Sequence, residues 1–304
     1  MAALSGRSGR KEVVAPRQRL TLLLLLLPIG VLLTVFFVLP FLFEVGFSVQ
    51  RYDPSVGYLP GITLRNYERF FTDDYYLTIW WRTVRIAVIT MVLCVILAYP
   101  VAIVLARARG WVKTALLLVT ISPLFVSTVV RAYGWILILG PNGPVVKILM
   151  ASGLTPERPR IIYTETAVII GMVEAMLPFT VLPISAVVGR IDQNLLHQAQ
   201  SLGANPFQTF LRITLPLSVP GMAAGSILVF ISAMGSFVTP SLLGGARIKT
   251  LAYEAYATMS TMSDWSLSST LGVVLLATTL LGIFIQARVL SGAAKRARSG
   301  AERG

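Results

Sequence analysis

Long apolar runs separated by short polar segments organise this chain of 304 residues. A helix that spans a bilayer needs about 20 mostly apolar residues. Six runs reach that length, at about 20–48, 83–106, 114–139, 164–189, 217–240 and 267–289. The pattern therefore predicts an all-α integral membrane protein with six transmembrane helices.

The first run could also belong to a cleaved signal peptide. It is about twice as long as the apolar core of such a peptide, and no cleavage site of small residues stands out after it. We interpret it as a retained helix. The expected organisation is a basic tail 1–19, a first transmembrane helix 20–48, a segment 49–79 outside the membrane, a five-helix core 80–289 and a tail 290–304.

Composition and charge support a membrane protein and give it an orientation. Hydrophobic residues make up 55% of the chain and charged residues 13%, which is about half the share in soluble proteins. Both tails and the loops 107–113 and 190–216 fall on one side and carry most of the Lys and Arg, so this side is expected to be cytoplasmic. The net charge of +13 then reflects topology and contact with membrane lipid, and no nucleic acid is needed to explain it.

Few residues offer catalytic or metal-binding chemistry. Cys94 and His197 are single, so neither a disulfide nor a multi-histidine metal site is expected. No Gly-Lys-Ser/Thr sequence occurs, so the chain lacks the loop that cradles nucleotide phosphates. We expect no cofactor in this chain and no enzymatic activity of its own.

The polar loop 190–216, between the fourth and fifth spans, carries ordered-helix signals. Asp192 can cap a short helix over 193–202, and Gly203 can supply the left-handed position that ends it. Asn205 can cap a second helix with Pro206 in its first turn. The polar positions of the first helix are uncharged, which favours a helix laid in a protein groove over one adsorbed to lipid.

The spacing within this loop resembles the EAA loop of ABC-importer permeases, which is Glu-Ala-Ala, three residues, Gly, nine residues and Ile-x-Leu-Pro. Gly203, Ile213, Leu215 and Pro216 match the pattern. His197-Gln198-Ala199 stand where the pattern has Glu-Ala-Ala, and only Ala199 agrees.

Further segments look like the spermidine/putrescine branch of these permeases. They are Asn66-Tyr67…Phe70, Thr83-Val-Arg-Ile-Ala, Ala98-Tyr-Pro-Val-Ala-Ile-Val-Leu-Ala106, Ser122-Pro-Leu…Ser127…Val130-Arg-Ala-Tyr-Gly-Trp135, Gly140-Pro-Asn-Gly143 and Gly235-Ser-Phe-Val-Thr-Pro-Ser-Leu-Leu-Gly244. The resemblance implies a type I importer fold in a bacterial inner membrane, with both termini cytoplasmic and 49–79 in the periplasm. It also implies three partners: cytoplasmic ATP-binding subunits docked on the loop, a second permease subunit and a periplasmic solute-binding protein.

One intramembrane carboxylate stands out as a candidate for the solute path. Glu174 lies in the middle of the fourth span, where an ionisable group is costly and points to function. It could offset the lost hydration of a polycation, or it could form a structural hydrogen bond or ion pair with a neighbouring span. Arg131, near the end of the third span, is expected to snorkel to the outer interface.

Three classes of function remain open from the residues alone. A binding-protein-dependent importer for polyamines is the first choice, and an opine, phosphonate or amino-acid-like solute is the alternative. An ion-coupled secondary transporter would show paired repeats and a relay of ionisable residues, and neither is evident. A membrane anchor would not need the spacing from Gly203 to Pro216.

Overall fold

The computed structural model describes residues 25, 27–53, 55–153, 155, 157 and 159–301, with the backbone alone for 290–301. The predicted basic tail 1–19 and the end of the second tail, 302–304, lie outside the described residues. Within the described part, six helical segments are long and apolar enough to cross a membrane. They are Leu27–Ser48, Asp74–Arg107, Thr128–Ala151, Glu165–Val188, Pro206–Met234 and Trp265–Val289. The predicted all-α membrane fold is confirmed.

Three helices form the centre of the molecule. Helices α4 (Asp74–Arg107), α8 (Glu165–Val188) and α11 (Leu215–Met234) pack against one another over most of their length. In lipid the hydrophobic effect does not drive helices together, so close packing and interhelical hydrogen bonds hold them. One such bond joins Tyr99 Oη of α4 to Ser218 Oγ of α11 at 2.6 Å, and both residues are buried.

The third predicted span, 114–139, is wrong as a single helix. The chain forms α5 (Gly110–Phe125) and α6 (Thr128–Leu139), separated by two residues with extended backbone, and α7 (Pro144–Ala151) follows. Pro123 lies in the last turn of α5 and lacks the N–H that would continue the helical hydrogen bonds. Because α5 is short, the apolar segment of spanning length is the one that begins at α6.

The fifth predicted span, 217–240, is displaced toward the polar loop. The helical backbone begins with α10 (Pro206–Thr209), continues through a π-helical turn at Phe210–Thr214 and becomes α11. It ends at Met234 because Gly235 and Ser236 interrupt it, and Pro240 starts a separate turn. The polar loop and the fifth span are therefore one continuous helical element.

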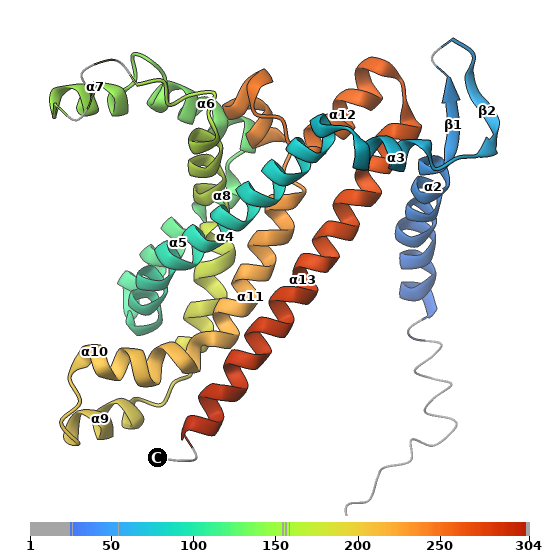
Figure 1. The fold of residues 1–304 in the computed structure, drawn as a ribbon. Helices are drawn as coiled ribbons and strands as arrows, with labels where there is room; N and C mark the ends of the chain where they lie inside the picture. Colours follow the sequence, from blue (N-terminus) through green and yellow to red (C-terminus); the bar gives the residue numbers. More distant parts are fainter. Residues whose placement is uncertain are drawn as a thin grey trace, which may run out of the picture.

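The end of the molecule opposite this loop carries the short elements (Figure 1). They are a hairpin of β1 (Gln50–Asp53) and β2 (Gly57–Ile62), α3 (Arg65–Thr72) and α12 (Leu251–Met262). The hairpin was not predicted. It is fixed to the turn after α12, where Tyr52 Oη donates to the Met262 carbonyl at 3.2 Å.

The first and last spans form a layer beside the centre. Helix α13 (Trp265–Ala301) crosses the molecule next to α11, and α2 (Leu39–Ser48) packs on its outer half (Figure 1). The contact is close because Thr270 Oγ1 donates to the Ser48 carbonyl at 3.0 Å and Gly272 faces the Glu44 carboxylate.

Candidate docking loop and solute-path residues

The first half of the polar loop has the local structure predicted for it. Helix α9 (Gln193–Ser201) starts at Asp192, whose carboxylate accepts a hydrogen bond from Asn194 N at 2.9 Å. Leu202 closes the helix, and Gly203 follows with a φ of +87°. The predicted cap and left-handed glycine are confirmed.

The second half begins with a reciprocal cap. Gln208 N donates to Asn205 Oδ1 at 2.8 Å, and Asn205 N donates to Gln208 Oε1 at 3.2 Å. Pro206 occupies the first turn, as expected. This helix runs on into α11, so the second half of the loop and the packed centre share one helical backbone.

The matched motif residues fall into two groups. His197 and Gln198 are exposed on α9, Gly203 forms the corner, and Ala199 is half-buried. Ile213, in the turn before α11, and Leu215 and Pro216, which begin α11, are half-buried. The first group is accessible to a partner, whereas the second anchors the loop to the spans.

Several apolar side chains of this loop are exposed although the loop is otherwise polar. Leu202 is 88% exposed and Phe207 is 67% exposed, and Leu195 and Leu211 are also exposed. Leu196 is the buried residue of α9. The Phe210 ring packs on the Tyr99 ring of α4, with the ring centroids 5.5 Å apart. An apolar patch rimmed by polar residues is typical of an interaction site.

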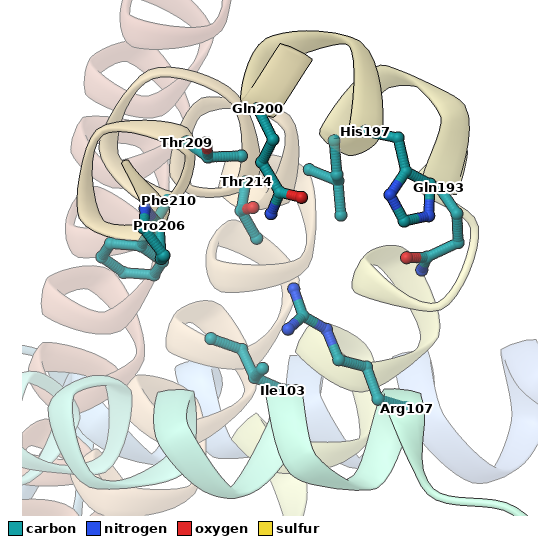
Figure 2. Close-up of a pocket in the computed structure, with 10 residues that line it drawn as sticks. Ile103, Arg107, Gln193, His197, Gln200, Pro206, Thr209, Phe210 and Thr214 are labelled. Atoms are coloured by element: carbon teal, nitrogen blue, oxygen red, sulfur yellow. The ribbon is translucent and has the colours of Figure 1, made fainter. Parts of the chain in front are cut away.

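A cavity of about 330 Å³ lies between the loop and the C-terminal end of α4. The loop supplies most of its lining, including the side chains of Gln193, His197 and Gln200. Figure 2 shows Arg107, the last residue of α4, pointing from below into this space toward Gln200. Arg107 falls within the predicted loop 107–113 and adds to its positive charge, and nothing in the local sequence pattern indicates a cavity.

The intramembrane carboxylate Glu174 forms an ion pair. Arg131 Nη1 lies 3.5 Å from Glu174 Oε2, and the two side chains are 15% and 30% exposed. The prediction that Arg131 snorkels is wrong, because the break before α6 places it in the first turn of that helix, facing α8. Trp135 and Thr239 line the small space around the pair.

This ion pair is incompletely hydrogen-bonded. Arg131 Nη2 has one long contact of 3.4 Å with Thr128 Oγ1. Arg131 Nε, Arg131 Nη1 and Glu174 Oε2 are buried without a hydrogen-bond partner among the described residues. Buried charges need additional hydrogen bonds to offset their desolvation, so this pair is held at a cost to stability.

A second group of paired side chains joins the segment 245–250 to α12 and to the start of α4. Lys249 Nζ donates to Tyr75 Oη at 2.7 Å and lies 3.4 Å from the buried Glu254 carboxylate. The Tyr75 hydrogen bond raises the pKa of Lys249 above its ordinary value, and the nearby charge of Glu254 acts in the same direction. This cluster fixes α12 to the start of α4. Among the described residues, no group of three His, Cys, Asp or Glu side chains could hold a metal ion.

Comparisons with known proteins agree on one family. Residues 98–294 match the family described as "Binding-protein-dependent transport system inner membrane component". The chain is 33% identical to the spermidine/putrescine transport system permease protein PotB of Haemophilus influenzae, over 84% of this chain and 89% of that protein. It is also 33% identical to PotB of Escherichia coli, over 83% and 91%.

Solved structures show the same fold at low sequence identity. A permease chain of a bacterial alginate ABC transporter, in complex with a periplasmic protein bound to an alginate pentasaccharide, has a TM-score of 0.71 at 16% identity and covers 92% of this chain and 96% of its own. A chain of the MetNI methionine ABC transporter has a TM-score of 0.54 at 16% identity, over 73% of this chain and 99% of its own.

Proposed function

The chain belongs to the family of binding-protein-dependent transport system inner membrane components, and we propose that the solutes it carries are the polyamines putrescine and spermidine. It is a permease subunit of an ABC importer. Family membership removes the ion-coupled transporter and the membrane anchor from consideration. The observation that supports polyamines is the 33% identity to spermidine/putrescine permeases along nearly the whole of both chains.

Other solutes are compatible with the same fold. A molybdenum transport permease, ModB of Mycobacterium bovis, is 31% identical over 66% of this chain, and molybdenum is a different kind of cargo from a polyamine. An opine, phosphonate or amino-acid-like solute therefore stays as the alternative. The longer and closer match to the polyamine permeases favours the first choice.

The loop 190–216 is proposed to dock a cytoplasmic ATP-binding subunit. Its support is the exposed apolar pair Leu202 and Phe207 beside exposed, uncharged polar residues of α9. ATP hydrolysis then takes place in the partner. Binding of ATP there displaces the loop, and the continuous helix from Pro206 to Met234 carries that displacement into α4 and α8.

Two further partners and the orientation belong to the same proposal. A second permease subunit completes the path, and a periplasmic solute-binding protein delivers solute at the end that carries the hairpin and α12. Both termini lie in the cytoplasm, which is consistent with the excess of Lys and Arg on the side of the loop.

Glu174 is proposed to contribute to the solute path. Its side chain is partly exposed and lies in the middle of α8, and one of its oxygens lacks a hydrogen bond. A cationic solute that reaches it shares or replaces the contact with Arg131. The net charge of the pair is zero, so the site holds no cation strongly and can release it.

The test is transport by the complete complex in proteoliposomes. Vesicles contain ATP inside, and the solute-binding protein is added outside with radiolabelled putrescine or spermidine. We expect uptake that needs both ATP and the binding protein. Vesicles with ADP, and vesicles without binding protein, are the controls. Uptake without ATP contradicts the importer mechanism, and ATP-driven uptake of another solute but not of polyamines contradicts the choice of solute.

A further inference from the structure

The cavity under the docking loop contains a cation that has no ionic partner among the described residues. Arg107 is the last residue of α4 and its side chain is exposed to this cavity. None of the ion pairs among the described residues involves Arg107. The described residues that line the cavity include no Asp or Glu, and Gln193, His197 and Gln200 of α9 are among the polar ones (Figure 2).

The departure from the EAA pattern accounts for the missing partner. His197 stands at the position of the glutamate in the pattern, and it lines the same cavity as Arg107. A glutamate at this position would put a carboxylate into the cavity. With histidine there, the described part of the chain offers Arg107 no carboxylate in this cavity, and the guanidinium can pair with a group that enters it.

We propose that this cavity receives an aspartate or glutamate side chain of the ATP-binding subunit, whose carboxylate pairs with Arg107. The inference rests on the proposed docking role of the loop. An arginine presents a planar fork that matches a carboxylate with two parallel hydrogen bonds. The side-chain amides of Gln193 and Gln200 donate to whichever carboxylate lone pairs the guanidinium leaves open.

The position of the cavity favours a protein partner over a lipid headgroup. Eight of its ten lining residues belong to the loop 190–216, and only Ile103 and Arg107 come from α4. The exposed Leu202 and Phe207 belong to the same loop. A partner that covers them therefore also contacts the loop that lines the cavity.

The contact joins the partner to two elements. The partner contacts the exposed surface of α9 and α10, and it contacts α4 through Arg107. Helix α4 packs against both α8 and α11. A movement of the ATP-binding subunit then acts directly on α11, through the loop, and on α4, through Arg107. A contact with the loop alone would act directly on α11 only.

The first test compares two arginine variants of the complete complex. Arg107→Gln removes the cation from the cavity. Arg109→Gln is the matched control, because Arg109 is exposed two residues further on, does not line the cavity and removes the same charge from the same side. We expect Arg107→Gln to weaken assembly with the ATP-binding subunit about tenfold or more, as for loss of a charged hydrogen-bonded pair, and Arg109→Gln to assemble like the wild type.

Assembly is measured without solute, as co-purification of the two subunits and as basal ATP hydrolysis. A wrong choice of solute leaves these readouts unchanged, so the two proposals fail separately. Equal assembly of Arg107→Gln and wild type overturns the inference. If Gly203→Asp abolishes assembly at the same time, the docking role of the loop survives and only the arginine contact is lost.

His197→Glu supplies a competing carboxylate within the chain. We expect it to lower assembly as Arg107→Gln does, since the new glutamate occupies the guanidinium. Tighter assembly of His197→Glu contradicts the inference. Repeating the Arg107→Gln assay in phosphatidylcholine vesicles with and without phosphatidylglycerol tests the lipid alternative, and a defect seen only with the anionic lipid assigns the cavity to a headgroup and overturns it.

A labelling experiment covers the case in which Arg107→Gln does not fold. Gln200→Cys, made in a Cys94→Ser background, places one thiol in the cavity. We expect its reaction with a small maleimide to be almost abolished when the ATP-binding subunit is assembled, because the partner then covers the cavity. An unchanged rate shows that the cavity stays open in the complex and contradicts the inference.

Discussion

At the scale of single residues, Gly203 decides the shape of the docking loop. Its φ of +87° lies in the left-handed region, where a non-glycine residue costs about 1–3 kcal/mol. Gly203→Asp therefore turns the second half of the loop away from α9 or breaks the turn. We expect uptake to be abolished while insertion into the membrane is retained, measured as transport and as protein in the membrane fraction.

Gly153 provides a control with the same backbone strain. Its φ is +71°, no atom lies within 4 Å of an added Cβ, and it belongs to the turn after α7 at the opposite end of the molecule. Gly153→Asp is expected to keep most of the uptake. Normal uptake in Gly203→Asp contradicts the docking role, and equal loss in both variants shows that strain alone is responsible.

The pair Arg131–Glu174 makes a prediction that separates structure from transport. Glu174→Gln leaves a buried cation without its partner, which costs about 3–5 kcal/mol in comparable sites. We expect little assembled protein from this single variant and from Glu174→Lys. Arg131→Gln combined with Glu174→Gln removes both charges and is expected to restore assembly.

Uptake by the double variant distinguishes a role of Glu174 in the solute path from a purely structural ion pair. If Glu174 contacts a cationic solute, the double variant assembles but transports polyamine at a small fraction of the wild-type rate. If the pair is only structural, transport returns together with assembly. Unchanged uptake kinetics in Glu174→Lys would remove Glu174 from the path altogether.

Several residues of the docking loop could be predicted because their causes are local. The caps at Asp192 and Asn205 and the turn at Gly203 depend on side chains within three residues. The exposure of Leu202 and Phe207 could not be predicted. It depends on how the loop lies on α4, and a helical-wheel argument places both residues on apolar faces without saying which face meets the protein.

At the scale of elements, the third span shows the limit of an apolar run as a predictor. Pro123 cannot donate to the Val119 carbonyl, and Ser122 Oγ donates to that carbonyl instead at 2.9 Å. Helix α5 then ends at Phe125, and Val126 is extended. The residues at the break are as apolar as a helix interior, so the apolar run in the sequence continues through it. The Ser122-Pro123 pair is the local sequence signal that indicates the end of α5.

Packing of α2 on α13 makes a prediction about two facing residues. A Cβ added at Gly272 would clash with Glu44 Oε1, so one of the two groups must move. Oε1 is the end of a flexible side chain, and the carboxylate can turn aside without a shift of the backbone. Gly272→Ala is therefore expected to leave α2 packed on α13 and to change the melting temperature of the purified permease little.

A glycine that faces backbone atoms gives the contrast. A Cβ added at Gly221 of α11 would lie 2.8 Å from the Pro183 carbonyl oxygen of α8, which cannot turn aside. Gly221→Ala is therefore expected to separate α11 from α8 and to lower the melting temperature, at a cost of about 1–3 kcal/mol. Gly134 has open space around it, so Gly134→Ala should be neutral. Equal melting temperatures of Gly221→Ala and Gly272→Ala contradict this assignment.

At the scale of the whole molecule, the hairpin shows what an apolar pattern cannot reveal. Tyrosines beside a membrane span, as in 49–79, are typical of an interfacial belt, and a belt requires no specific partner for each ring. In the structure the Tyr58 hydroxyl accepts a hydrogen bond from Trp265 N at 3.1 Å, across about 200 positions of sequence. Such long-range pairing fixes β1 and β2 on the turn before α13, and no short-range signal specifies it.

The orientation of the molecule is the remaining consequence of the charge pattern, and it is open to a direct test. In a Cys94→Ser background, Val56→Cys places a thiol on the hairpin, where Val56 is 73% exposed. Arg109→Cys places one between α4 and α5, at an exposed position outside the docking cavity. The two reporters therefore stand on opposite sides of the membrane.

A membrane-impermeant maleimide added to spheroplasts is expected to label Val56→Cys at once and Arg109→Cys only after the membrane is permeabilised. The physical reason is that translocating the Lys and Arg of the tails and inner loops is far costlier than retaining them. The reverse labelling pattern would place the loop 190–216 in the periplasm, out of reach of any ATP-binding subunit, and the docking proposal would fail with it.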